Sequence, residues 1–229
     1  NRFWLFDQCA MKVGTDGVLL GAWASLDKQP ESILDIGAGT GLIALQLAQR
    51  SLAETIDAIE LDNDAYEQCV VNFEASPWGD RLFCYHAGFD EFVDEMDDSY
   101  DLIVSNPPFY SEDVLSGDEA RDKARQSSSL PFDELVSGAA KFLTKNGIFA
   151  VIIPFKEEAT FIELAQKARL YPNRITRVKG NPDANFKRSL MEFSFHENKT
   201  LVDSLVIEEG RHQYTEKYIK LTQAFYLKM

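Results

Sequence analysis

The sequence predicts an α/β fold in which a mostly parallel sheet is covered by helices on both faces. Short apolar segments that are typical of strands alternate with longer segments that are typical of helices, which is the order found in parallel sheets. Two of the expected strands also run directly into turns, one rich in glycine after Ile36 and one rich in proline after Ser105. Ligands of open α/β sheets bind at the carboxyl ends of the strands. The two turns therefore predict where the functional site lies.

The first half of the chain gives four strands and four helices in strict alternation. The strands are expected at residues 32–36, 55–60, 81–86 and 101–105, and the helices at 16–25, 41–50, 62–74 and 89–96. A turn is expected at 76–80, where proline and glycine break the pattern. In the strand order 3-2-1-4-5 the fourth strand lies beside the first, so the two turns are expected to be neighbours.

The second half of the chain adds a polar loop and a hairpin. Residues 110–129 contain three consecutive serines and are interpreted as a loop that could close over a substrate. Helices are expected at 132–143 and 157–168, with a turn at Asn146-Gly147 and a strand at 148–153 between them. Strands at 175–178 and 190–196 form the hairpin around a loop at 179–187, and 201–208 is expected to be a further strand.

The glycine-rich turn after the first strand predicts a nucleotide-type ligand. Asp35 is followed by Gly37, Gly39 and Gly41, and glycines let the backbone approach a ligand closely and adopt positive φ. Glu60 ends the second strand, where a carboxylate suits the two hydroxyls of a ribose. Leucine at position 42 does not fit the dinucleotide fingerprint, which needs glycine or alanine there, and the phosphate-binding pattern with lysine is absent from the sequence.

The turn Asn106-Pro107-Pro108-Phe109 predicts chemistry on an amino nitrogen. Both prolines lack an N–H group and fix φ, so they end the pairing of the strand and make the turn rigid. The amide oxygen of Asn106 and a nearby backbone carbonyl can accept both hydrogens of a planar NH2 group. Phe109 offers a flat apolar face on which a ring can stack. These four residues are the candidate catalytic group.

Composition is that of a soluble globular protein. The chain has 229 residues, 45% of them hydrophobic, and no run that reaches the ~18 apolar residues of a membrane span. Its cysteines, Cys9, Cys69 and Cys84, are odd in number and lack metal-ligand spacing, so reduced thiols in the cytoplasm are expected and neither a disulfide framework nor a metal site.

Charge is distributed unevenly along the chain. The net charge is −14, which by itself argues against a nucleic-acid partner because phosphate contacts need lysine and arginine. The stretch from Lys167 to Arg188 nevertheless has seven basic residues and one acid, and Arg121, Lys123 and Arg125 form a smaller basic group. Both are candidate RNA contacts, although a solvated surface is the simpler reading of any charged run. The acidic remainder would repel wrongly docked RNA.

Several of these residues carry a resemblance to known methyltransferases. Asp35 to Gly41 resembles the S-adenosylmethionine loop of class I methyltransferases, Glu60 resembles their ribose-binding acid, and the turn at Asn106 resembles the catalytic motif of members that methylate an amino nitrogen. Residues 9–23 (CAMKVGTDGVLLGAW) are similar to the N-terminal signature of bacterial tRNA(Val) adenine-N6 methyltransferases, the YfiC-like family. The tail 214–227 (YTEKYIKLTQAFYL) resembles the C-terminus of that family. One departure is that Asp7 follows Phe6 at once, where the family usually has several residues between them.

The resemblance implies a fold, a cofactor and a substrate. The implied fold is a Rossmann-like single methyltransferase domain over 1–229, with a seven-stranded sheet in the order 3-2-1-4-5-7-6, an N-terminal extension at 1–30, a core at 31–196 and a C-terminal strand and tail at 197–229. The implied reaction is transfer of a methyl group from S-adenosylmethionine to N6 of an adenine in the anticodon loop of a valine tRNA. Further cofactor contacts are implied for Lys12, Thr15, Gly88 and Phe89. Oligomeric state cannot be read from the sequence.

Two other classes of function remain open at this stage. The first is another amino-nitrogen methyltransferase acting on guanine N2 of 16S rRNA, on glutamine N5 of a protein or on adenine of DNA. The glutamine and DNA enzymes usually carry an added domain for which this chain is expected to have no room. The second is a tRNA-binding protein that keeps the fold without the activity, against which the complete glycine turn and the Asn106 turn both count.

Overall fold

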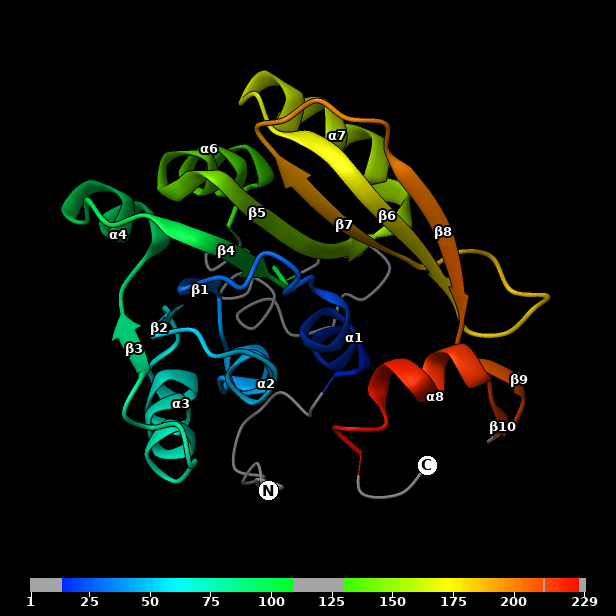
Figure 1. Cartoon of the computed structure of the whole chain (residues 1–229), viewed down its shortest axis with the longest axis horizontal. Helices are drawn as coiled ribbons and strands as arrows, with labels where there is room; N and C mark the ends of the chain where they lie inside the picture. The colour runs from blue at the N-terminus through cyan, green and yellow to red at the C-terminus, as the bar shows by residue number, and fades with distance from the viewer. Residues whose placement is uncertain (1–13, 109–129, 212, 227–229) are drawn as a thin grey trace, which may run out of the picture.

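Eight strands form one twisted sheet in the computed structural model, which describes residues 14–108, 130–211 and 213–226 (Figure 1). Their order is β3-β2-β1-β4-β5-β7-β6-β8. The strands are β1 (Ser32–Ile36), β2 (Thr55–Glu60), β3 (Leu82–His86), β4 (Tyr100–Ser105), β5 (Leu143–Pro154), β6 (Tyr171–Lys179), β7 (Arg188–Ser194) and β8 (Leu201–Val206). A separate short ribbon pairs β9 (Glu208–Gly210) with β10 (Gln213–Tyr214).

The predicted strand order 3-2-1-4-5-7-6 is confirmed. The further strand expected at 201–208 forms β8, which joins the edge of the same sheet as an eighth strand beside β6. Only β7 runs antiparallel to its neighbours β5 and β6, and β8 pairs in parallel with β6. The carboxyl ends of β1, β2, β4, β5 and β6 therefore meet at one edge of the sheet. The strand β7 begins at that same edge.

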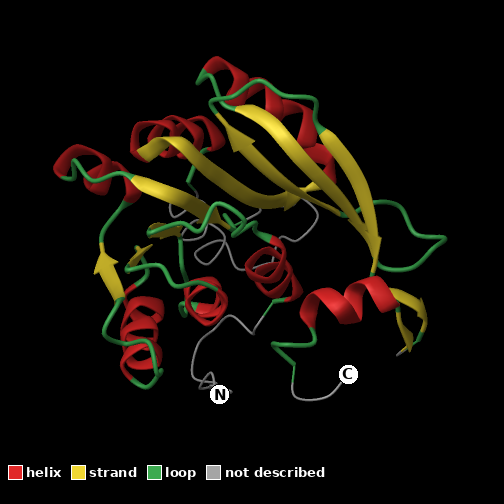
Figure 2. Ribbon diagram, viewed as in Figure 1, coloured by secondary structure: helices red, strands yellow, loops and turns green. Residues whose placement is uncertain are grey.

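Helices cover both faces of the sheet, as predicted (Figure 2). The helices are α1 (Thr15–Trp23), α2 (Leu42–Arg50), α3 (Asn63–Glu74), α4 (Phe89–Glu95), α6 (Phe132–Phe142), α7 (Glu158–Lys167) and α8 (Glu216–Thr222), with a 3-10 turn η1 at Phe155–Glu157. One face packs on α1, α2, α3 and α8, and the opposite face on α4, α6 and α7. None of the described helices is long and apolar enough to cross a membrane.

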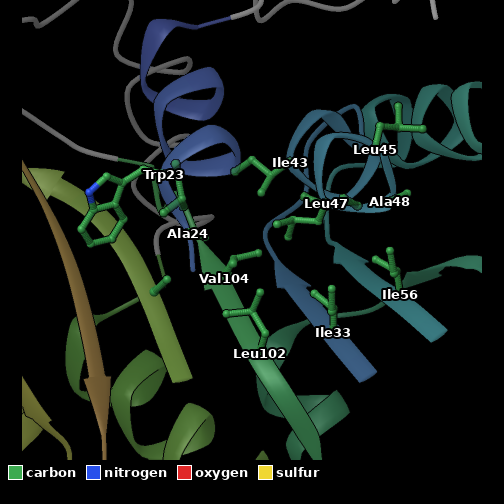
Figure 3. Packing of buried hydrophobic residues seen from close by; sticks show 14 of the residues in the cluster. Trp23, Ala24, Ile33, Ile43, Leu45, Leu47, Ala48, Ile56, Leu102 and Val104 are labelled. Atoms are coloured by element: carbon green, nitrogen blue, oxygen red, sulfur yellow. The ribbon is translucent and has the colours of Figure 1, made fainter. Parts of the chain in front are cut away.

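The first hydrophobic cluster fixes α1 and α2 on the sheet (Figure 3). Ile33 and Leu102 project from β1 and β4 into this cluster, and Leu47 of α2 covers them. Trp23, the last residue of α1, packs on β6. Its indole N–H donates to Thr176, and the guanidinium of Arg174 lies 3.8 Å from its ring centroid. Since α1 is held at both α2 and β6, its N-terminal turn is held beside the carboxyl edge of the sheet.

One expected turn was placed wrongly. Asn146 and Gly147 lie inside β5 and do not form a turn before it, because this strand begins at Leu143. The pairing with β4 shifts between Tyr100, opposite Leu143, and Leu102, opposite Ile148. Three extra residues of β5 are thus accommodated as an irregularity in the ladder, which explains why turn-forming residues occur within a strand.

Candidate active site

The glycine turn and the asparagine turn are adjacent, as the topology predicted. In the register of the sheet, Ile36 pairs with Ser105 on one side and with Ile59 on the other. The hydroxyl of Ser105 also donates to the carbonyl of Ile36 at 2.9 Å, which fastens the two strand ends together. The residues that follow these three positions are Gly37, Asn106 and Glu60. The central strands therefore place the glycine turn, Glu60 and the asparagine turn side by side at the carboxyl edge of the sheet.

The glycine turn has two parts with different roles. Gly37 and Gly39 have φ of +70° and +58°, and a Cβ added at either position would meet no atom within 4 Å. Their backbone thus borders open space that a ligand can approach. Gly41 also has positive φ, but a Cβ there would lie 2.5 Å from the ring of Phe73 and 2.8 Å from the sulfur of Cys69. Gly41 is therefore required for the packing of α2 on α3.

Glu60 connects the end of β2 to the glycine turn. Its Oε2 accepts a hydrogen bond from the amide of Gly39 at 2.7 Å, and its Oε1 accepts one from the amide of Asp62 at 2.8 Å. A carboxylate has about four lone-pair positions, so each oxygen can accept a further hydrogen bond from a ligand hydroxyl. Asp62 in turn caps α3 by accepting from the amide of Ala65. The geometry of the turn thus depends on Glu60.

Asp35 is a fully buried carboxyl group below the glycine turn. Its Oδ2 accepts from the amide of Ala44 in the first turn of α2 at 3.1 Å, whereas its Oδ1 is buried without a hydrogen-bond partner. Burial raises the pKa of Asp35 to about 7; the hydrogen bond from Ala44 opposes this shift and the nearby charge of Glu60 adds to it. Asp35 is therefore placed to order the turn. Its single hydrogen bond does not fully offset the cost of burying a charged carboxylate.

Replacing Asp35 with asparagine tests this balance through the pH dependence of stability. The raised pKa means that the folded protein holds a proton which the unfolded chain releases near pH 4, so this contribution to stability is fully present below about pH 4. As pH rises from about 4 to about 7, this contribution is lost, and the free energy of unfolding falls by at most about 4 kcal/mol in total. In denaturant titrations between pH 5 and 8, Asp35→Asn should remove that decline. Stability curves that stay parallel for the two proteins would contradict the account.

Asn106 lies at the end of β4, half-buried, and faces the start of α1. A Cβ added to Gly17 of α1 would lie 4.0 Å from the amide nitrogen of Asn106 and 3.2 Å from Leu42. Glycine at position 17 therefore leaves room beside the Asn106 amide. Pro107 is buried and Pro108 is exposed, so the turn is anchored by the first proline and open at the second. Phe109 lies outside the described residues.

The remaining predicted cofactor residues are distributed around the same edge. Thr15 is exposed at the first position of α1, and Lys12 lies outside the described residues. Gly88 precedes α4, and its amide donates to Glu91 at 3.2 Å. The ring of Phe89 is buried and lies 6.5 Å from that of Phe142. The backbone of Gly88 and Phe89, and not the Phe89 ring, is thus what this segment can offer to a ligand.

Two supporting contacts were not foreseen from the sequence. The buried amide of Asn72 donates to the carbonyl of Thr40 at 2.9 Å and so braces the glycine turn from α3. Asp16 of α1 forms an ion pair with Arg188 of β7 at 2.7 Å, which ties the start of α1 to the carboxyl edge. The side-chain oxygen of Asn72 accepts a hydrogen bond from the side-chain amide of Gln68, one helical turn earlier. Nothing in the sequence alone relates Asn72 to residue 40.

The basic stretch from Lys167 to Arg188 does not form one surface. Arg174 and Arg177 point to opposite faces of β6, where each makes a two-pronged contact with a carboxylate, Glu192 for Arg174 and Glu158 for Arg177. Lys167 and Arg169 precede β6 and so lie at the edge opposite the candidate site, whereas Lys179, Lys187 and Arg188 lie at the same edge. The second basic group, Arg121 to Arg125, is outside the described residues.

These features fit S-adenosylmethionine. The open space beside Gly37 and Gly39 lies at the N-terminus of α2, where Gly41 provides no side-chain cap, and this suits the carboxylate of the methionine part. The available lone pairs of Glu60 suit a ribose diol, and the negative charge of Glu60 suits a cationic ligand. The candidate amide of Asn106 lies on the neighbouring strand, where an acceptor substrate would meet the methyl group.

A Rossmann-like sheet with a glycine turn after β1, an acid after β2 and this asparagine turn after β4 defines a methyltransferase. Consistent with this, residues 14–168 match the model of the methyltransferase small domain. The chain belongs to the tRNA1(Val) (adenine(37)-N6)-methyltransferase family, because it is 64% identical over 224 residues to the protein of that name from Flavobacterium johnsoniae, covering 97% of this chain and 95% of the relative. The same name is carried by a protein of Bacteroides fragilis at 43% identity, with 97% and 94% coverage.

Solved structures show the same fold at low sequence identity. A predicted O-methyltransferase from Agrobacterium tumefaciens matches with a TM-score of 0.71 at 18% identity, covering 91% of this chain and 96% of the other. The ribosomal protein L11 methylase of Lactobacillus delbrueckii matches with a TM-score of 0.56 at 14% identity, with 79% and 78% coverage. These structures support the fold, and the family model and the relatives confirm the expected S-adenosylmethionine-dependent methyltransferase class.

Proposed function

We propose that this protein transfers the methyl group of S-adenosylmethionine to the exocyclic N6 of adenine 37, beside the anticodon, in a valine tRNA. The observation that carries the proposal is the sheet register that sets Asn106 next to the glycine turn and Glu60. The names of the relatives supply the nucleotide and the tRNA. A tRNA substrate also implies that the protein acts in the cytoplasm.

Asn106 acts on the amino group of the adenine. S-adenosylmethionine supplies a methyl group that is already electrophilic, so the protein contributes alignment and electrostatics. The N6 lone pair is delocalised into the ring and is a poor nucleophile. Hydrogen bonds from N6 to the Asn106 side chain and the Pro107 carbonyl favour a pyramidal nitrogen and spread the positive charge that develops on it. Phe109 is proposed to hold the base by stacking.

Glu60 and the glycine turn position the cofactor. Glu60 accepts hydrogen bonds from the ribose, and the backbone of Gly37 and Gly39 lies against the methionine part. Asp35 orders this turn from below, and Thr15 and Lys12 are proposed as further cofactor contacts from the N-terminal side. Because the target base must leave its stack to reach Asn106, a single-stranded anticodon loop is a better substrate than a duplex.

Transfer of labelled methyl groups to bulk tRNA tests the proposal. The tRNA is taken from a strain that lacks the gene, and the product is analysed by nucleoside mass spectrometry after individual tRNAs have been isolated. We expect N6-methyladenosine in a valine tRNA. Incorporation into rRNA, DNA or protein in its place would retain the chemistry of Asn106 and overturn the substrate. Cofactor binding without transfer to any of these would favour the non-catalytic alternative.

A further inference from the structure

The carboxyl edge of the sheet carries a basic and aromatic surface that joins two segments distant in sequence. Lys156 follows the end of β5, and Lys187 lies in the loop between β6 and β7. The amide of Phe155 donates to the carbonyl of Lys187 at 3.0 Å, and the rings of Phe155 and Phe186 are 5.5 Å apart. These contacts hold the β5 end and the loop at 180–187 together as one surface.

The lysines of this surface direct positive charge to the solvent. The side chain of Lys156 is 61% exposed and its carboxylate contact with Glu157 is long, at 3.9 Å. Lys187 is exposed as well, whereas the half-buried Lys179 donates from its ammonium to the carbonyl of Pro182 and lies 5.8 Å from the ring centroid of Phe186. Arg174 and Arg177 differ from them because each is held by a carboxylate within the fold. The exposed charge at the carboxyl edge therefore comes mainly from Lys156 and Lys187, whereas Lys167 and Arg169 are exposed at the opposite edge.

The surface lies on β5 and β7, which extend past the end of β4. Ser105, the last residue of β4, pairs with Val151, and β5 continues for three more residues to Pro154, which pairs with Arg188. At about 3.3 Å per residue, β5 extends roughly 10 Å past the end of β4. Lys156 and Lys187 thus stand on a rim beside the turn that carries Asn106.

We propose that this rim is the docking surface for the RNA strand that flanks the target adenine, an inference that rests on the proposed function. Lys156 and Lys187 contact phosphates, and Phe186 stacks on a flanking base. Proteins that bind single-stranded nucleic acid combine basic side chains that contact the phosphates with aromatic rings on which bases stack. The lysines and the aromatic ring of this rim provide both. Because the whole chain has a net charge of −14, the surface outside this rim is acidic overall and repels RNA.

The salt dependence of tRNA binding tests the docking surface independently of methyl transfer. Affinity for a valine tRNA transcript is measured by fluorescence anisotropy from about 50 to 200 mM salt for the wild type and for Lys156→Ala/Lys187→Ala. Two lost phosphate contacts should reduce the slope of log Kd against log salt by about two. Phe186→Ala should weaken binding several-fold, on the order of one lost stack, without changing that slope.

The matched control is Lys167→Ala/Lys199→Ala, which removes two exposed lysines at the opposite edge of the sheet. Its slope should equal that of the wild type, and calorimetry should give the same cofactor affinity for all variants. A wild-type slope in Lys156→Ala/Lys187→Ala, or equal slope losses in both double variants, would overturn the docking surface while leaving the proposed function intact. Failure of the wild type to bind or methylate any tRNA would overturn the proposed function itself.

Discussion

Replacing Asn106 with alanine should reduce kcat for methyl transfer by about 10²-fold or more while cofactor affinity changes little. The loss is expected because the Asn106 amide makes its interaction with N6 mainly as charge develops there, and removing one such group typically costs about 10²–10³-fold. The glycine turn and Glu60 are untouched by the substitution, so the cofactor should still bind. Single-turnover kinetics at saturating cofactor measures the effect on the chemical step.

Two comparisons show whether this loss is chemical. Asn106→Asp keeps the size of the side chain but replaces the amide with a carboxylate, so its activity should depend on pH in a way that the alanine variant does not. Cofactor affinity by calorimetry should stay within about threefold of wild type for both variants, a difference of less than 1 kcal/mol. A kcat that is unchanged in Asn106→Ala would remove Asn106 from the catalytic group.

Glu60→Ala should weaken cofactor binding by about 10²-fold, with the loss of activity appearing mainly as a raised KM for the cofactor. Two effects combine. The ribose loses its acceptor, and the amides of Gly39 and Asp62 lose the carboxylate that now holds them at 2.7 and 2.8 Å. Hydrogen bonds to a charged group contribute about 1.5–3 kcal/mol each. Calorimetric titration with S-adenosylmethionine gives the affinity directly.

Glu67→Ala provides the control for Glu60, because Glu67 is an exposed acid on the neighbouring helix α3 whose contact is with Asn63. It removes the same charge without touching the glycine turn and should leave cofactor affinity unchanged. Glu60→Gln should fall between wild type and Glu60→Ala, since its amide keeps one acceptor oxygen. A wild-type affinity in Glu60→Ala would mean that the ribose is held elsewhere.

The central part of the fold was predictable because local pattern and topology agree there. The strands β1 and β2 have the expected bounds, since each is an apolar run ended by a residue that breaks pairing or carries charge. The adjacency of Gly37, Glu60 and Asn106 followed from the rule that parallel strands place their carboxyl ends together. The rule does not say which residues are level with one another. The register of Ile36 with Ser105 and Ile59 in the structure shows this.

The distribution of the basic residues could not be predicted in the same way. A strand alternates its side chains between two faces, so Arg174 and Arg177, although close in sequence, point to opposite sides of β6. Each meets a carboxylate from another part of the chain, Glu192 or Glu158. Lys156 lay outside the stretch that the sequence singled out. The fold places it beside that stretch through the hydrogen bond between Phe155 and Lys187 and the contact of the Phe155 and Phe186 rings.

The most direct test of the central claim is single-turnover methylation of a defined valine tRNA transcript, compared with the same transcript carrying guanine at position 37. Nucleoside mass spectrometry after nuclease mapping identifies the modified residue. The account predicts one N6-methyladenosine at position 37 with the wild-type protein, none in the guanine transcript, and at most a slow trace with Asn106→Ala. Equal methylation of both transcripts would contradict it, because the amino group held at Asn106 would then not be that of adenine 37.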